Sequence, residues 1–543
     1  MMSLDRSPAI DKDVQTLHAM GYAQEMQRRM GGFSNYAISL SIICILAGGI
    51  TSFHVGLCSV GGASIGLCWP LMSFLALAFA ATMAQVSSAF PTAGGLYHWS
   101  SILGGRGWGW GTAWLNLAGL ITVMAAVNQA TFQFMLGAFA PRLGYSPETV
   151  SYWLGCLSNA SVADELIGSA DPAVWSILVV QVVFVSIITF SQALFNDRGI
   201  RLTTRLTDFS GYVILVVSVT LTLALFFFAK DYDFSRLVTF TNYSGLPEGG
   251  AVWPKTESMA WLFALGILLP AYTITGFDGS AHTSEETKNA SLEVPRAIVR
   301  AVAVSAVFGW LLLIALVIAI PDMDAAVAQG ANVFFWIIDQ ILPNWLNVVL
   351  LVGITMTQYC CGLALVTSAS RVIYAFSRDG GMPFSDVLCG VSPIYRTPRA
   401  AVWLSAALVV SFTLLVPYIT ITAVGVIFLY LSYVMPTLAS LLAHGRTWTS
   451  MGPWHLGLWY KPLAGICILS GVGLFIIGVQ PPNHIAIWIV PGFAVFLIVY
   501  WYAIKCRNFE GPPSGTVSEE RHAEILATER ALDAAHASRN ADS

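Results

Sequence analysis

The chain has 543 residues, of which 56% are hydrophobic and only 10% are charged. An ordinary soluble domain carries about 25% charged residues, so this composition excludes a set of water-soluble domains, and it also excludes disordered, collagen-like and disulfide-stapled classes. The formal net charge of −4 provides no basic face for nucleic acid, and we predict an all-α polytopic membrane protein.

Residues 1–35 are polar and are expected to form a cytoplasmic segment. A membrane-spanning helix needs about 20 mostly apolar residues, and we expect twelve such helices. They are 36–60, 66–90, 110–137, 173–195, 207–229, 258–284, 297–320, 346–376, 400–416, 419–443, 462–480 and 484–504. An amphipathic stretch at 325–342 is expected on the membrane surface, and residues 510–543 are expected to form a charged cytoplasmic tail.

The positions of Lys and Arg predict the orientation. With the N-terminus inside, 22 of the 26 basic residues fall on the inner side. The four on the outer side are Arg142, Lys230, Arg236 and Lys255. Because cytoplasmic loops carry an excess of Lys and Arg, we expect both termini in the cytoplasm and an even number of spans.

Two of the expected spans contain glycine clustered with hydroxyl residues. The first span contains AGGITS at 47–52, and the sixth contains TGFDGS at 275–280. Glycine costs about 1 kcal/mol in a helix interior, so both stretches are expected to unwind. Unwound backbone is tolerated in a bilayer only where it is buried in protein or lines a watery cavity. Helices interrupted at corresponding places in two halves are typical of transporter binding sites.

Three titratable residues lie in or beside these two stretches. A carboxylate at bilayer depth costs roughly 2.5–3.5 kcal/mol, so Asp278 either lines a functional cavity or ends the sixth helix at the inner surface. His54 and His282 flank the two breaks. Each of them can relay protons or serve as a hydrogen-bonded structural histidine.

Several longer motifs resemble a known family. They are SSAFPTAGGLYHW at 87–99, GFDGSAHTSEET at 276–287, EVPRAI at 293–298 and SRDGGMP at 377–383. Gly21-Tyr22 and Phe33-Ser34 also fit. These stretches resemble the amino acid–polyamine–organocation superfamily, and they are most similar to its amino acid/choline transporter branch, which includes GABA and choline permeases.

The resemblance implies a LeuT-like fold. Residues 36–229 and 258–443 would form two inverted five-helix repeats, and residues 462–504 would add helices eleven and twelve. The family breaks helix six at the matching Gly-Phe-Asp, which favours a cavity position for Asp278. The inner half of helix six would then run from about Ser280 toward Glu286.

The expected site holds a small solute between the two breaks. A substrate carboxylate would face free N–H groups near a half-helix N-terminus in the first span, and an ammonium would face carbonyls near Leu46 and in the sixth, with Phe277 as an aromatic gate or a packing residue. The substrate-binding candidates are Gly48, Gly49, Ile50, Thr51, Ser52, Ile274, Thr275, Gly276, Phe277 and Asp278.

The coupling ion is less directly indicated. Thr367 and Ser368 resemble the hydroxyl pair that binds sodium in some LeuT-fold proteins, although hydroxyls in a helix usually bond to the preceding turn. Residues 207–229 contain no Lys, the residue that some proton-coupled relatives use. We expect proton coupling in preference to sodium. The candidate ion-coupling residues are Thr367 and Ser368 for sodium and His54 and His282 for protons, and we expect no cofactor or metal.

The expected function is that of a secondary transporter. It would import an amino acid or related amine such as GABA across the plasma membrane by alternating access. The alternatives are a choline or polyamine carrier, a sodium-coupled amino acid symporter, and a non-transporting membrane sensor. An enzyme is not expected, because the spans contain no clustered acid, base or metal ligands.

Overall fold

The computed structural model describes residues 8–167, 172–247, 252–481, 483–513 and 517–541. Parts of the two predicted end segments, residues 1–7, 514–516 and 542–543, lie outside the described residues. The described chain contains helices and two isolated bridges but no strand of a sheet. The predicted all-α polytopic fold is confirmed.

Ten helical stretches among the described residues are long and apolar enough to cross a membrane. They are Gly32–Thr51, Ser64–Ala89, Arg106–Phe139, Pro172–Asp197, Ile200–Phe228, Ala290–Ile318, Asn344–Arg378, Tyr418–Ala443, Gly457–Gly478 and Ala486–Asn508. The sixth and ninth expected spans correspond to the shorter apolar helices Met259–Thr273 and Arg399–Leu415. The ninth is short because Pro398 and Pro417 bound it.

The helices that position the centre of the molecule come from both halves of the chain. In chain order they are α2 (Gly32–Ile43), α3 (Gly48–Thr51), α4 (Phe53–Val60), α5 (Trp69–Ala89), α6 (Leu96–Gly104), α7 (Arg106–Phe139), α10 (Pro172–Asp197), α11 (Ile200–Phe228), α12 (Met259–Gly266), α13 (Leu268–Thr273), α14 (Gly279–His282), α15 (Ala290–Ile318), α18 (Asn344–Arg378), α20 (Arg399–Leu415), α21 (Tyr418–Ala443), α22 (Tyr460–Gly478) and α23 (Ala486–Tyr500).

The long helices α7 and α18 pack against each other, and α7 also packs along α21. The apolar window of α7 is 78% buried, whereas that of Ala486–Asn508 is only 11% buried. Apolar side chains that remain exposed on such a helix suit a lipid-facing position. The polar side chains discussed below therefore lie in a core of helices from both halves, with α23 at the periphery.

The break in the sixth span is confirmed, and the break in the first span is displaced. Residues 274–278 separate α13 from α14, and Gly276 has a φ of +80°. In the first span, α2 ends at Ile43, the next residue Cys44 has a φ of +29°, and helix resumes at Gly48. The prediction that residues 47–52 unwind is therefore wrong for most of that stretch.

The displacement removes the free N–H groups expected in the first span. The N–H groups of Gly49, Thr51 and Ser52 donate to the carbonyls of residues 45, 47 and 48, at 3.1, 3.1 and 3.0 Å. The prediction that these N–H groups are free to bind a substrate carboxylate is wrong for this conformation, because they already donate to carbonyls in the preceding turn.

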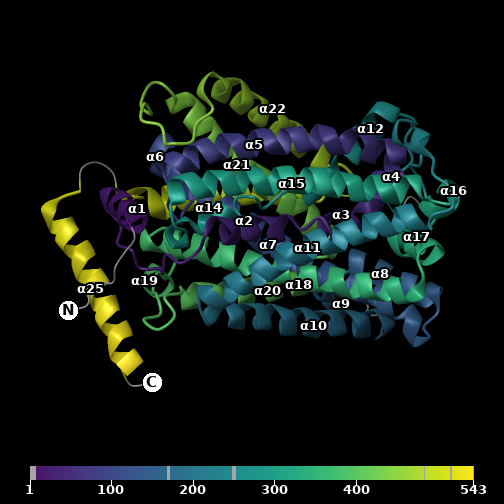
Figure 1. Cartoon of the computed structure of the whole chain (residues 1–543), viewed down its shortest axis with the longest axis horizontal. Coiled ribbons are helices and arrows are strands. Elements are labelled where there is room, and N and C mark those ends of the chain that lie inside the picture. The colour runs from purple at the N-terminus through teal and green to yellow at the C-terminus, as the bar shows by residue number, and fades with distance from the viewer. Residues whose placement is uncertain (1–7, 168–171, 248–251, 482, 514–516, 542–543) are drawn as a thin grey trace.

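The bundle has two distinct ends (Figure 1). The first and last described helices, α1 (Pro8–Ala19) and α25 (Glu519–Ala541), lie at one end, here called the terminal end, together with α19 (Ser385–Leu388). The opposite, far end carries α8 (Pro147–Asn159), α16 (Met323–Val327) and α17 (Val333–Ile341). The last two, with a short 3-10 turn, form the predicted amphipathic stretch 325–342.

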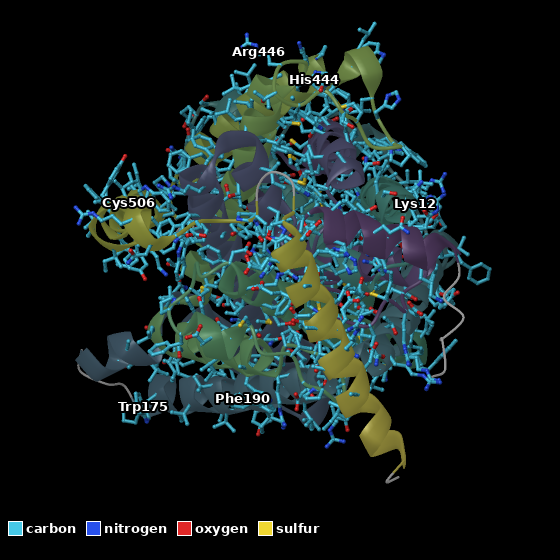
Figure 2. All side chains as sticks on the ribbon, turned by 90° about the vertical axis from the view of Figure 1, so that its left-hand side faces the viewer. Lys12, Trp175, Phe190, His444, Arg446 and Cys506 are labelled. Carbon is cyan, nitrogen blue, oxygen red and sulfur yellow. The ribbon has the colours of Figure 1, made fainter. Side chains whose placement is uncertain are left out.

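The charged tail is predicted only as a cytoplasmic segment, but its helix α25 packs on the N-terminal segment. Figure 2, which faces the terminal end, shows α25 crossing in front of the bundle. Glu529 of α25 lies 2.7 Å from His18 Nε2, and the Arg521 side chain donates to the Gly21 carbonyl at 3.3 Å. Asp533 accepts from Arg396 at 2.6 Å.

Candidate functional site

The two breaks lie against each other in the middle of the bundle. A methyl group at Gly48 would lie 2.9 Å from the Thr273 Cα, and one at Gly276 would lie 2.1 Å from Ile42 Cγ2. Only glycine permits these approaches. A methyl group at Gly49, by contrast, would find its nearest neighbour, on Thr273, 3.8 Å away, so the close approach depends on Gly48.

Protein side chains pair the backbone groups that the sixth-span break releases. The Gly276 N–H donates to the Tyr433 hydroxyl at 3.0 Å, and the Tyr430 hydroxyl donates to the Ile274 carbonyl at 3.3 Å. The Ser39 hydroxyl donates to the Phe277 carbonyl at 2.8 Å. The unwound backbone is thus buried in protein, which is one of the two environments that a bilayer allows.

Two cavities lie on the far side of the breaks. One has a volume of about 150 Å³ and is lined by α13, α21 and α22, and the other has a volume of about 450 Å³ and is lined by α7, α8 and residues 328–335. Five residues line both cavities: Thr51, His54, Val252, Tyr418 and Ile419. No Asp, Glu, Lys or Arg lines either cavity in the described part of the chain.

The predicted substrate residues divide into two groups. Ile50, Thr51 and Ser52 line these cavities. Among the described lining residues, the other candidates do not appear: Gly48, Gly49, Ile274, Thr275, Gly276, Phe277 and Asp278. In this conformation they form the packed wall between the cavities and the terminal end. Phe277 is fully buried, with its ring centroid 4.9 Å from that of Tyr433.

Asp278 lies in a buried polar cluster rather than in either predicted setting. Its exposed fraction is 0%. Its Oδ2 accepts from Asn116 Nδ2 at 3.0 Å and lies 3.0 Å from His282 Nε2, while Oδ1 accepts from the Tyr433 hydroxyl at 2.8 Å. Helices α7, α14 and α21 therefore supply the groups around this carboxylate.

The two hydroxyls singled out for sodium do not converge. The Thr367 hydroxyl donates to Asn196 Oδ1 at 2.7 Å and lies 3.1 Å from the Leu363 carbonyl one turn back. The Ser368 hydroxyl has no hydrogen-bond partner among the described residues and lies 3.1 Å from where a methyl group at Gly279 would stand. Thr367 thus shows the back-bonding that is usual for helical hydroxyls.

Aromatic hydroxyls at the cavities are the main residues that the sequence interpretation omits. The hydroxyls of Tyr272 and Tyr418 interact with each other, and that of Tyr418 also interacts with Thr51. These contacts join α13, α21 and α3. Tyr430 also lines the smaller cavity, and its spacing from Tyr433 marks an aromatic face of α21 in the sequence. No comparable spacing marks Tyr272 and Tyr418.

A dense ionic cluster closes the terminal end. Arg371 donates to both oxygens of Glu286 at 3.1 Å, and Arg378 donates to those of Glu285 at 3.1 and 2.9 Å. Both glutamates are fully buried. We call these four residues, together with Asp379, the terminal seal. Its bidentate pairs have the strong geometry of charge-assisted hydrogen bonds.

Residues from the N-terminal segment and from α6 surround this seal. Tyr22 and Tyr97 donate to Asp379 Oδ2 at 2.9 and 2.8 Å, and His98 Nε2 lies 3.2 Å from the same atom. Arg28 donates to the carbonyls of residues 284 and 287. The motifs that carried the family resemblance therefore meet in space, and they close the path between the breaks and the terminal end.

Comparison with known proteins identifies the family. A family model described as "Amino acid permease" matches residues 30–504. The chain belongs to this amino acid permease family. It is 28% identical to the amino-acid permease BAT1 of Arabidopsis thaliana over 94% of this chain and 98% of that protein. It is 26% identical to the GABA-specific permease of Saccharomyces cerevisiae over 95% of this chain and 88% of that protein.

The permease is accordingly a multi-pass membrane protein that transports amino acids, not an enzyme. The resemblance to the amino acid–polyamine–organocation superfamily is confirmed. Its substrate is a small amino acid, and its apolar helices embed it in the bilayer.

Proposed function

We propose that the permease imports an amino acid such as GABA across the plasma membrane, driven by protons. Residues 36–229 and 258–443 act as two inverted repeats that rock against each other, as in LeuT-like carriers. The terminal end faces the cytoplasm, in keeping with the excess of Lys and Arg there. The observation that carries the proposal is the contact of two broken helices beside cavities that reach toward the far end.

The charge of the cavity lining supports a zwitterionic substrate. An acidic residue deep in the site would favour a carrier for choline or polyamines, but the one candidate, Asp278, is held by Asn116, His282 and Tyr433. GABA is a zwitterion with no net charge, so a lining without charged side chains leaves no net charge in the cavity, provided that hydroxyls and rings satisfy its two charged ends. The name of the yeast GABA-specific permease supports a γ-amino acid.

The substrate binds where α3, α13 and α21 meet. Tyr272 and Tyr418 line the smaller cavity, and their hydroxyls donate to the substrate carboxylate, while tyrosine rings attract the ammonium. Rocking of the repeats then separates the Gly48–Thr273 contact and brings residues 274–277 into the opened path. On this account Ile274, Thr275, Gly276 and Phe277 contact the substrate after the seal opens, while Asp278 stays in its polar cluster.

Protons are favoured over sodium as the driving ion. The Thr367 hydroxyl is already donated to Asn196, and Ser368 faces Gly279 instead of joining Thr367. Sodium would need several oxygens at one point, whereas a proton needs only one titratable group. Asp278 with His282, and His54 at the cavities, provide such groups.

Uptake into proteoliposomes tests the proposal. The purified permease is reconstituted, and uptake of labelled GABA, choline and putrescine is compared under an inward proton gradient. Each uptake is measured with and without sodium. We expect GABA to accumulate with the proton gradient and without sodium. Choline uptake without GABA uptake would support the rival carrier, and ligand binding without any flux would support the sensor.

A further inference from the structure

Asp278 and His282 form a buried pair that makes no ion pair with the arginines of the terminal seal. Both side chains have an exposed fraction of 0%, and their polar atoms lie 3.0 Å apart. In the described residues, Asp278 has no ion-pair partner other than His282, and the arginines of the terminal seal are already bound to Glu285 and Glu286. We propose that Asp278 and His282 form the protonation site that couples proton movement to the break in helix six.

The groups that face the pair are neutral. Helix α7 contributes Asn116, and α21 contributes Tyr433, while the loop before α6 contributes the Ala93 carbonyl, 3.4 Å from His282 Nδ1. Ionised Asp278 with a neutral imidazole carries one net negative charge, and one added proton brings the pair to zero. A buried net charge costs several kcal/mol, so loading and unloading this proton shifts the energy of the closed packing strongly.

A single hydroxyl links this charge to the break. The Tyr433 hydroxyl donates to Asp278 Oδ1 at 2.8 Å and accepts from the Gly276 N–H at 3.0 Å. A hydroxyl has one proton to donate. When Asp278 takes up a proton on Oδ1, it can donate to Tyr433, and the tyrosine proton is freed to turn elsewhere. The hydrogen bonds that hold the unwound backbone thus depend on the protonation of the carboxylate.

The route to the terminal end passes through one loop. Residues 90–95 separate His282 from the seal: a methyl group at Gly95 would lie 3.0 Å from His282 Nδ1, and Thr92 lies 2.6 Å from His98 Nδ1. His98 in turn contacts Asp379. The pair is therefore shut off from the terminal end only while this loop and the seal stay in place, and opening the seal releases the proton there.

This inference rests on the proposed function, and two assays separate them. Net accumulation driven by an inward proton gradient measures coupling, whereas counterflow of labelled substrate at equal pH on both sides needs binding and rocking alone. We expect Asp278→Asn to lose more than tenfold of the driven accumulation while counterflow stays within twofold of the unsubstituted chain. His282→Gln is expected to behave like Asp278→Asn, with a loss of driven accumulation and retained counterflow.

Two control variants match these substitutions. Asp208→Asn removes a carboxylate that bonds to Ser34, and His444→Gln removes a ring that stacks on Tyr460. Both are expected to leave both assays unchanged. Tyr433→Phe keeps the pair but removes the linking hydroxyl, and we expect it to lower the number of protons taken up per substrate, measured with a pH dye inside the vesicles, with counterflow intact.

The outcomes are distinct. Undiminished driven accumulation in Asp278→Asn overturns the inference. So does the result that His54→Gln loses driven accumulation while the Asp278 and His282 variants keep it. Loss of counterflow together with accumulation, in a variant of unchanged thermal stability, makes Asp278 a substrate contact and also overturns it. If Asp278→Asn does not fold, the proton stoichiometry of Tyr433→Phe decides. Absence of counterflow in the unsubstituted chain for every amino acid refutes the proposed function instead.

Discussion

The two ends of the bundle differ in the chemistry of their side chains. The terminal seal uses buried carboxylates held by arginines in bidentate pairs, whereas the far end is lined by neutral hydroxyls and aromatic rings around open volume. Partly opened forms of the seal are unfavourable, because a charged side chain that loses its partner while still buried costs free energy. The far end can change in small steps, because hydroxyl contacts exchange readily with water.

This difference indicates how the two gates are used. On the proposed mechanism the seal opens as a whole, its glutamates and arginines regain hydration, and it acts as a two-position switch. On the same proposal the cavity side admits and orients a solute without a comparable barrier. The following substitutions compare the two regions, beginning with the largest expected effect.

Removing one partner of a seal pair has the largest expected effect. Glu286→Gln leaves the Arg371 guanidinium buried without a counter-charge, which costs about 3–5 kcal/mol. We expect a large fall in the thermal unfolding midpoint and loss of uptake. Glu524→Gln breaks an exposed pair with Arg521 on α25 and is expected to cost less than about 1 kcal/mol. Equal stability of the two variants would contradict the assigned role of the seal.

Substituting the glycine between the two regions comes next. Gly276→Ala places a side chain at a φ of +80°, which costs about 1–2 kcal/mol, and presses a methyl group against Ile42. We expect uptake to fall steeply, and Gly276→Ala/Ile42→Ala to recover part of it. Gly492→Ala on α23 meets nothing within 4 Å and serves as the control. Full activity of Gly276→Ala would show that the break is dispensable.

The seal is also expected to respond to acid. Burial raises the pKa of Glu285, but the Arg378 guanidinium and the Ala93 N–H lower it by more, so it lies below its usual value. The carboxylate therefore stabilises the fold fully above the ordinary glutamate pKa of about 4.3, and this stabilisation is lost as pH falls through the lowered pKa. The gap in unfolding midpoint between the permease and Glu285→Gln should narrow below pH 4. A constant gap would exclude this linkage.

A cavity hydroxyl gives the smallest expected effect. Tyr418→Phe removes a hydroxyl that interacts with Tyr272 and Thr51, and a single hydrogen bond contributes about 0.5–1.5 kcal/mol. We expect KM for the transported amino acid to rise about 3–10-fold, with thermal stability nearly unchanged. Tyr502→Phe, on a 72% exposed side chain, is the matched control. An unchanged KM would remove Tyr418 from the binding site.

Local sequence features predicted the fold better than the site. Apolar run lengths located the membrane helices, and glycine chemistry located the break at Gly276. The first break was placed too late, because Cys44 adopts the unusual φ and the glycines after it stay helical. Two of the three partners of Asp278, Asn116 and Tyr433, come from helices more than 150 residues away in sequence. Periodicity within one helix does not determine which distant helix it faces.

The docking of α25 has a consequence for how the molecule is made. Residues 519–541 touch residues 18–24, and residues 22–30 in turn insert into the seal. These contacts can form only after the ribosome has completed all the membrane helices in between. Residues 18–24 therefore reach these contacts only once α25 has been made, so their docking is a late step in the assembly of the molecule.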